Sequence, residues 1–435
     1  MKIYKFGGTS IGSANRMKDA AKLITNTERK IVVVSAISGT TNTLLKIAEH
    51  LYSKKNYDAE LLINELENKY RLIADGLFDN SKFLCKGKEL IDLNINNIKS
   101  LAQNAFTIHE EKAILAHGEL ITTALFQLYL QEQKVDSVLL PALNFMRIDA
   151  NGEPDNYYIK ENLKREFEKH PGKNLFITQG YICRNLYGKI DNLKRGGSDY
   201  TASLIGTAVG ADEIQIWTDI NGFHNNDPRF VENTKPISKL SFDEAAELAY
   251  FGAKILHPLS INPAKVSNIP VRLKNTIKPE NEGTLISSIA EGKGIKAVAS
   301  KDGITALKIK SGRMLLAYGF LRKVFEVFER YKTPIDMITT SEVAVSVTID
   351  DTTFLKEISV DLAQYGVVEL NENQSIICIV GENIIEQEGY INKIFEALKS
   401  FKIRMISYGG SRHNISVLVK AEDKKEALNA INEIL

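Results

Sequence analysis

The chain is poor in cysteine and has no long apolar segment. Its 435 residues include three cysteines, Cys85, Cys183 and Cys378, far apart and without a CxxC motif or a histidine at ligand spacing. A disulfide framework and a zinc site are therefore not expected, and each cysteine is predicted to be a small buried hydrophobic residue. No apolar run approaches eighteen residues and no basic-then-apolar leader opens the chain. These absences favour a soluble, cytoplasmic protein.

An excess of charge of one sign is also missing. The 55 basic and 54 acidic residues nearly cancel. This balance gives no reason to expect a nucleic acid as a partner, or a membrane. A chain of this length is expected to form two or three domains, each with ample core.

What is present is a glycine-rich turn close to the start. The motif KFGGTS, residues 5–10, places Lys5 near the end of a short apolar strand, with Gly7 and Gly8 directly after it. Glycines let the backbone approach an anion closely, and the free N–H groups of a following helix start are donors. The next segment has Ser13 as its predicted N-cap. One face of that helix is expected to consist of Met17, Ala20, Ala21 and Ile24. An ordinary turn with a solvated lysine is the alternative, because the Walker-type motif is absent.

The first two thirds of the chain alternate strand-like and helix-like segments. Short apolar runs of the kind found in parallel strands buried on both faces lie at 31–38, 135–140, 175–182, 213–218 and 270–275. We predict one α/β domain with a mainly parallel sheet, covering residues 1–290. Ligands of such sheets bind at the carboxyl ends of the strands.

The last third begins after a predicted linker, residues 291–302, and repeats itself. The segments that start at Phe320 and Ile391 share the order helix, strand, polar turn, strand, which is half of a βαββαβ unit. We predict a first unit over 313–374 that is inserted into a second, formed by 303–312 and 375–435. Such paired units bind small ligands; a purely architectural dimerisation tail is the alternative.

Further polar motifs of the first domain carry chemistry. RGGSDY, residues 195–200, is a second glycine turn at the start of a predicted helix. The cation Arg195 precedes its glycines and the acid Asp199 follows them. HGELITT, residues 117–123, buries Glu119 in an apolar helix, where a carboxylate needs a partner. WTDINGFHNNDPR, residues 217–229, follows a buried strand with an acidic loop and an aromatic that could lean on a base. Each motif alone is typical of surface loops, but their combination indicates a binding site.

Together these motifs resemble the aspartate kinases. KFGGTS, the GE of HGELITT, TQGYI, RGGSDY, WTDxxGxxxxDPR and FGAKILHP occur in the order of that family, and the likeness covers essentially the whole chain, including two C-terminal repeats similar to its paired ACT domains. The resemblance implies the amino-acid-kinase fold followed by two ferredoxin-like ACT domains. It implies transfer of the γ-phosphoryl of ATP to the side-chain carboxylate of L-aspartate with Mg²⁺, the first step toward lysine, threonine and methionine. No dehydrogenase domain is seen, so a monofunctional enzyme is expected.

The resemblance also implies roles for individual residues. Lys5 would neutralise the transferring phosphoryl group and Asp199 would orient it. Aspartate would be bound by Thr41, Glu119, Tyr181, Arg195, Gly196, Gly197 and Ser198, with Arg195 on a carboxylate and Glu119 on the ammonium. The nucleotide would be bound by Lys5, Phe6, Gly7, Gly8, Thr218, Asp219, His224, Asp227, Arg229, Lys254 and Ile255. His224 is a departure, because the family often has a tyrosine there. The Mg²⁺ ligands are not identified.

The regulatory repeats resemble the lysine-responsive subgroup of the family. Asp336 would receive the ammonium of L-lysine, and the backbone at the helix start after Gly319 would take its α-carboxylate. The full implied effector site is Met314, Gly319, Phe320, Leu321, Ile335, Asp336, Thr340, Ser341 and Glu342. Ala317 stands where that subgroup often has a serine. A homodimer through the ACT domains is expected.

Two other functions remain open from the sequence. One is a kinase of another acidic amino acid, glutamate or N-acetylglutamate, which RGGSDY together with Glu119 disfavours. The other is a non-catalytic amino-acid sensor on a kinase fold, which the joint presence of Lys5, Asp199 and Arg195 disfavours.

Overall fold

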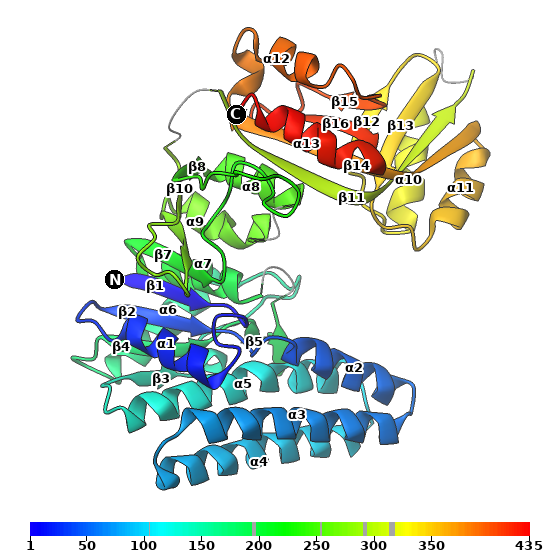
Figure 1. The fold of residues 1–435 in the computed structure, drawn as a ribbon. Helices are drawn as coiled ribbons and strands as arrows, with labels where there is room; N and C mark the ends of the chain where they lie inside the picture. Colours follow the sequence, from blue (N-terminus) through cyan, green and yellow to red (C-terminus); the bar gives the residue numbers. More distant parts are fainter. Residues whose placement is uncertain (104, 194–196, 253–254, 290–293, 313–317) are drawn as a thin grey trace. The chain divides into compact units, whose positions relative to one another are not determined.

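The computed structural model describes the chain except for residues 104, 194–196, 253–254, 290–293 and 313–317. The chain divides into two compact units (Figure 1). The N-terminal unit comprises residues 1–223, 238–242 and 256–289. The C-terminal unit comprises residues 224–237, 243–255 and 290–435. Two segments predicted to belong to the first domain, 224–237 and 243–255, therefore group with the C-terminal unit.

The N-terminal unit is built on an eight-stranded sheet with the order β3-β4-β2-β1-β7-β9-β10-β8. Its strands pair in parallel except β10, which runs antiparallel to β9. The prediction of a mainly parallel α/β sheet is thus confirmed. The strands of this unit are β1 (Lys2–Phe6), β2 (Lys30–Val34), β3 (Val138–Leu140), β4 (Leu175–Gln179), β5 (Ile182–Arg184), β6 (Ile190–Asn192), β7 (Glu213–Thr218), β8 (Lys239–Ser241), β9 (Val271–Asn275) and β10 (Thr284–Ser287).

Helices surround this sheet. They are α1 (Ala14–Ile24), α2 (Thr40–Tyr52), α3 (Asn56–Leu77), α4 (Ser81–Gln103), α5 (Ile108–Glu132), α6 (Asn156–Glu168), α7 (Gly197–Val209) and α9 (Asn262–Val266), with the 3₁₀ turns η1 (Ala142–Asn144) and η2 (Pro258–Ile261). The helix predicted after the first glycine turn is α1. Ser13 caps it by accepting the backbone N–H of Arg16, and the predicted face is the buried one.

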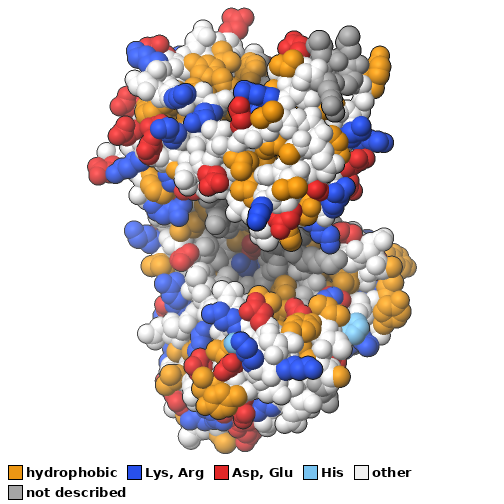
Figure 2. Space-filling view, turned by 90° about the vertical axis from the view of Figure 1, so that its right-hand side faces the viewer, with side chains coloured by type: hydrophobic (Ala, Val, Ile, Leu, Met, Phe, Trp, Pro, Cys, Tyr) orange, Lys and Arg blue, Asp and Glu red, His pale blue; other side chains and the backbone are white. Residues whose placement is uncertain are grey.

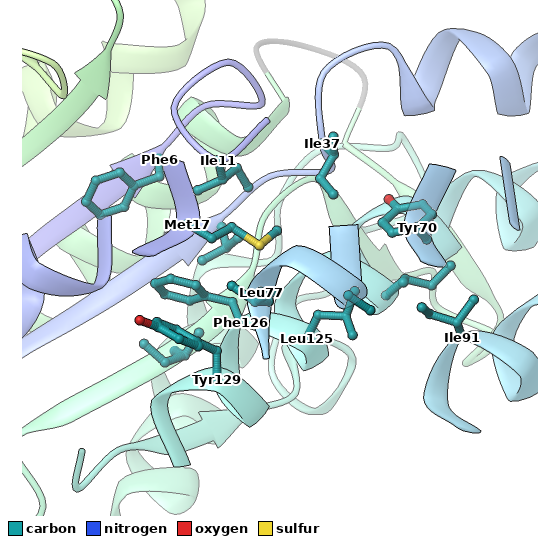
Figure 3. Close-up of a cluster of buried hydrophobic side chains, with 14 of the residues drawn as sticks. Phe6, Ile11, Met17, Ile37, Tyr70, Leu77, Ile91, Leu125, Phe126 and Tyr129 are labelled. Atoms are coloured by element: carbon teal, nitrogen blue, oxygen red, sulfur yellow. The ribbon is translucent and has the colours of Figure 1, made fainter. Parts of the chain in front are cut away.

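Strand alternation decides which side chains of β1 face which helices. Tyr4 and Phe6 point into the hydrophobic cluster shared with α1 and α3–α5, part of which Figure 3 shows. Lys5 lies between them in the sequence and so points to the opposite face of the sheet. Its carboxylate partner, Asp199, lies in the first turn of α7.

Helix α5 is the most apolar element of the unit. By length and composition this helix could cross a membrane, but 78% of its apolar stretch is buried inside the protein. It begins with a capping box between Thr107 and Glu110 and ends at Glu132. We therefore interpret α5 as the core helix of the unit, and Glu119 lies in its buried middle.

The C-terminal unit is built on a six-stranded sheet with the order β12-β13-β11-β14-β16-β15. Its elements are α8 (Phe242–Tyr250, all but its first residue), β11 (Gly294–Lys310), α10 (Phe320–Arg330), β12 (Ile338–Thr340), β13 (Ala344–Ile349), α11 (Leu355–Ala363), β14 (Val367–Glu382), η3 (Ile384–Glu386), α12 (Tyr390–Ala397), β15 (Met405–Ser407), β16 (Asn414–Lys420), η4 (Ala421–Asp423) and α13 (Lys424–Asn432).

Two long strands run through both halves of this sheet. β11 pairs with β14 along its whole length, with β13 only over residues 305–310, and β14 pairs with β16 over residues 374–380. Two core clusters lie on this framework, one with α10 and α11 and one with α12 and α13. The two repeats thus share β11 and β14 instead of dividing at residues 303 and 375, and their exact boundaries stay a prediction.

Two local predictions are wrong. Residues 294–302, expected in the linker, are part of β11, where their backbone pairs with the distant strand β14. Cys85 is exposed on α4, although Cys183 and Cys378 are buried as predicted. The spacing of Cys85 in the sequence could not reveal which face of α4 it occupies.

Candidate active site

A cavity of about 380 Å³ lies at the carboxyl ends of the parallel strands. It is lined by residues that follow β1, β2 and β4 and by the starts of α2 and α7, with one side chain from α5. The lining residues are Gly8, Ser35, Ala36, Ile37, Ser38, Gly39, Thr41, Asn42, Glu119, Tyr181, Gly197 and Ser198. The predicted substrate residues Thr41, Glu119, Tyr181, Gly197 and Ser198 therefore meet in one place.

Glu119 is the charged side chain among these lining residues. It is 3% exposed, and its Oε1 accepts the backbone N–H of Ala36 at 3.2 Å. Its Oε2 is buried and has no hydrogen-bond partner in the described part of the chain. Burial raises the pKa of Glu119 to about 8, although the N–H of Ala36 favours the carboxylate. A buried carboxylate with one free oxygen beside a cavity is suited to a ligand cation.

The loop 35–39 between β2 and α2 forms one wall of this cavity and is tightly fixed. Gly8 lies directly against it, because a Cβ at Gly8 would come within 2.7 Å of the carbonyl oxygen of Ala36. The Oγ1 of Thr122 accepts the N–H of Ile37 at 3.3 Å and also contacts the hydroxyl of Tyr70 at 3.1 Å. Ile37 and Tyr70 both belong to the buried cluster of Figure 3. The wall is thus anchored to the core.

Lys5 and Asp199 form an ion pair of 2.7 Å at the same end of the sheet. Their side chains are 12% and 15% exposed, so the pair is mostly shielded from water. Gly7 leaves space for the ammonium, since a Cβ there would lie 3.2 Å from Lys5 Nζ. A held cation beside a glycine turn can stabilise an anionic group.

Tyr181 follows β4 in an unusual backbone conformation. Its φ is +63°, in the left-handed region that a bulky residue seldom adopts. The Oγ1 of Thr201 in α7 accepts its backbone N–H at 2.9 Å. The ring is mostly buried, which raises the pKa of Tyr181 to about 12. The tyrosine is therefore neutral at physiological pH and presents a fixed wall to the cavity.

The predicted nucleotide residues fall in both units. Thr218 and Asp219 follow β7 in the N-terminal unit, where Thr218 Oγ1 donates to Asp219 Oδ1 at 3.2 Å. Asp227 and Arg229 belong to the C-terminal unit, where they form an ion pair of 2.6 Å. Each pair is formed locally. Whether they bind one nucleotide stays a prediction.

Other predicted nucleotide residues have limited freedom. The ring of Phe6 is buried and stacks on Trp217 with ring centroids 5.8 Å apart, so neither ring faces outward. Trp217 is consequently not the aromatic that leans on a base. His224 contacts Thr234 Oγ1 through Nδ1 at 2.9 Å, and burial lowers the pKa of His224. Ile255 is half-buried in the C-terminal unit.

Several predicted site residues lie outside the described chain. They are the substrate residues Arg195 and Gly196, the nucleotide residue Lys254 and the effector residue Met314.

The predicted effector site lies on described elements of the C-terminal unit. Gly319 is the N-cap of α10 with a φ of +78°, so Phe320 and Leu321 are the first residues of the helix, whose N–H groups have no acceptor within the helix. Thr340 ends β12, and Ser341 and Glu342 lie in the turn before β13, where the N–H of Ser341 donates to Ala344 O. Ile335 is half-buried before β12 and packs beside the first-repeat core.

Asp336 has two partners within the protein that were not predicted. Its Oδ1 accepts hydrogen bonds from the Lys301 ammonium at 2.6 Å and from the Tyr250 hydroxyl at 3.1 Å. Lys301 also lies 2.8 Å from Asp350. Sequence reasoning missed Lys301 and Tyr250, because residues 35 and 86 positions away leave no local signal.

Lys69 was missed in the same way at the cavity. Its ammonium, from α3, donates to the carbonyl oxygen of Ser38 at 2.7 Å and so braces the cavity loop.

The visible face of the molecule in Figure 2 mixes basic and acidic side chains with apolar ones. No broad field of one sign covers that face, in agreement with the balanced composition.

Comparison with known proteins gives a consistent result. Residues 1–275 match the amino acid kinase family, and residues 377–435 match the ACT domain. The chain is 33% identical to the lysine-sensitive aspartokinase 3 of Escherichia coli, covering 100% of this chain and 98% of that protein. It is 32% identical to the chloroplastic aspartokinase 3 of Arabidopsis thaliana, covering 99% and 80%.

Solved structures agree. Aspartokinase III of E. coli in complex with aspartate and ADP has a TM-score of 0.85, and the same enzyme with lysine and aspartate has one of 0.86. Each is 33% identical to this chain and matches 100% of this chain and 99% of its own.

Proposed function

The chain belongs to the aspartokinase family and is an ATP-dependent aspartate kinase, and from that premise we propose which of its residues bind the substrates and the effector. The reaction moves the γ-phosphoryl group of ATP to the side-chain carboxylate of L-aspartate and gives 4-phospho-L-aspartate. It is the first step toward lysine, threonine and methionine.

The observation that carries the proposal is the free oxygen of Glu119. The ammonium of L-aspartate would bind Glu119 Oε2, which is buried, unpartnered among the described residues and beside the cavity. An arriving ammonium supplies the partner that this carboxylate lacks, so binding removes an unfavourable feature of the free enzyme. Thr41, Tyr181, Gly197 and Ser198 would form the remaining walls, and Arg195 and Gly196 would complete the site as the family resemblance implies.

Chemistry at this site requires no general base. The carboxylate of aspartate is ionised at neutral pH and can attack phosphorus directly. Lys5, held by Asp199 at 2.7 Å, would neutralise the charge that the transferring phosphoryl group carries, while Gly7 and Gly8 allow close approach. Catalysis then consists of positioning and electrostatic stabilisation. Mg²⁺ would arrive with ATP as part of that substrate.

Regulation by L-lysine belongs to the same proposal. Its support is the helix start at Gly319 and the buried acid Asp336, which offer donors for a carboxylate and an acceptor for an ammonium. The E. coli relative is named lysine-sensitive and has been solved with lysine. A homodimer through the ACT domains, and a cytoplasmic location, remain predictions from the sequence.

A substrate panel tests the proposal. The acyl phosphate formed from ATP, Mg²⁺ and L-aspartate, L-glutamate or N-acetylglutamate would be trapped with hydroxylamine. We expect product with L-aspartate alone, and Arg195→Ala should raise the KM for aspartate strongly but leave the KM for ATP almost unchanged. Equal activity with glutamate, or equal changes in both KM values, would contradict the assignment.

A further inference from the structure

The two carboxylate oxygens of Asp336 have different surroundings. Oδ1 accepts hydrogen bonds from Lys301 and Tyr250, as described above. Oδ2 is buried and has no hydrogen-bond partner in the part of the chain that the structure describes, and the side chain as a whole is 1% exposed. A buried oxygen without a partner is unfavourable. Asp336 therefore has one oxygen in use and one available.

The charges around Asp336 leave one negative charge without a partner. Asp336 and Asp350 both face the ammonium of Lys301, at 2.6 and 2.8 Å. Two carboxylates against one ammonium make a net charge of minus one within this cluster. A second ammonium at Oδ2 would balance it and would not have to displace Lys301. The geometry thus favours an effector that adds to the cluster.

Tyr250 links this cluster to a helix of kinase sequence. It ends α8, which lies inside the segment 1–275 that matches the amino acid kinase family, yet α8 packs within the C-terminal unit. Glu244 of α8 pairs with Lys296 at 2.8 Å. Gly252 lies so close to β11 that a Cβ would come within 2.0 Å of Ser300 O. The end of α8 is thereby fixed beside Lys301.

We propose that Tyr250 couples effector binding at Asp336 to the affinity of the enzyme for its nucleotide. A ligand ammonium at Oδ2 draws on the charge of the same carboxylate and weakens the hydrogen bond that Tyr250 donates to Oδ1. The end of α8 is then bound less tightly to Asp336. Tyr250 precedes Lys254 by four positions in the sequence, and Lys254 is a nucleotide residue by family resemblance. The proposal rests on the effector assignment made above.

The test measures coupling separately from binding. L-Lysine would be titrated by calorimetry into full-length wild type and Tyr250→Phe, with and without a saturating non-hydrolysable ATP analogue. In the wild type, the analogue should weaken lysine binding by a factor in the usual range of about 5 to 150. Tyr250→Phe should bind lysine within about twofold of the wild type when nucleotide is absent, and its coupling factor should fall toward one.

The chain offers a matched control. Tyr331 also donates its hydroxyl to an aspartate, Asp361, at 3.1 Å in the same unit. Tyr331→Phe should keep the wild-type coupling factor. The proposal is overturned if Tyr250→Phe keeps that factor, if Tyr331→Phe loses it equally, if Tyr250→Phe no longer binds lysine, or if the wild-type factor is near one. A wild type that does not bind lysine at all would instead refute the effector assignment and, with it, the coupling.

Discussion

Each unit of the protein contains a lysine–aspartate pair of nearly the same length, but the two pairs have different neighbours. Lys5 and Asp199 are 2.7 Å apart beside a glycine turn. Lys301 and Asp336 are 2.6 Å apart and are joined by the carboxylate of Asp350 and the hydroxyl of Tyr250. The first ammonium has a glycine turn beside it, where an anion can approach. The second is surrounded by acids.

The surroundings indicate what each pair does. An ion pair next to open backbone can transfer its attraction to an incoming phosphoryl group, so we expect Lys5 and Asp199 to contribute to chemistry. An ion pair closed by a second acid neutralises a carboxylate that is almost inaccessible to water, so we expect the loss of its cation to destabilise the fold. Distance alone would not separate the two functions.

The largest expected effect is on the first pair. Lys5→Ala should lower kcat by about 100-fold to 1,000-fold, the scale of one lost electrostatic donor of roughly 3 kcal/mol. Steady-state kinetics with saturating ATP and aspartate measure this. Thermal unfolding should also shift down, because the pair is mostly shielded from water and the Oδ1 of Asp199 is buried. A kcat within threefold of the wild type would contradict the role of Lys5.

The second pair should affect the stability of the protein. Lys301→Met leaves Asp336 buried without its cation, and removing one partner of a buried pair costs about 3 kcal/mol of unfolding free energy. Denaturant unfolding of the full chain measures this. A control is Lys310→Met on the same strand, whose pair with Glu369 is about half exposed and should contribute little. Equal destabilisation by both substitutions would remove the distinction between the two pairs.

Glu119 provides a third comparison, as a buried acid with no cation among the described residues. Glu119→Gln should raise the KM for aspartate about 10-fold to 100-fold, the value of one charged hydrogen bond. The KM for ATP should stay close to that of the wild type. Glutamine keeps an oxygen for the N–H of Ala36, so the cavity loop is not expected to move. Unchanged aspartate affinity would place the ammonium elsewhere.

The smallest expected effect is a pH dependence. With a pKa of about 8 in the free enzyme, Glu119 is mostly protonated at pH 7 and must lose its proton when it binds an ammonium. The kcat/KM for aspartate should therefore rise by up to about tenfold per pH unit toward pH 8 and then level off. Glu119→Gln should lack this rise. A profile that is flat between pH 6 and 8 in the wild type would contradict the loss of a proton from Glu119 on aspartate binding.

Linkage gives the matching stability effect. The pKa of Glu119 is raised on folding, so its contribution to stability is fully present below its unfolded pKa and is lost as pH rises toward 8. The melting temperature of Glu119→Gln relative to the wild type should therefore increase across that range. A difference that does not depend on pH would contradict the raised pKa.

The sequence determined much of this protein. The alternation of strand-like and helix-like segments indicated the parallel sheet. Helical spacing indicated the buried face of α1, which includes Met17 and Ile24. The motifs around Lys5, Glu119 and Asp199 identified the family, and the resemblance named half of the residues that line the cavity. These properties are local, because strand and helix periods and glycine turns are encoded within a few neighbouring residues.

Tertiary structure decided the rest. Lys301, Tyr250 and Asp350 surround Asp336, and Lys69 braces the cavity loop, although no motif connects these residues. The sharing of β11 and β14 between the repeats, and the exposure of Cys85, were likewise not predicted. Each depends on which distant segment packs against which face, and that is set by burial and charge pairing across the folded chain.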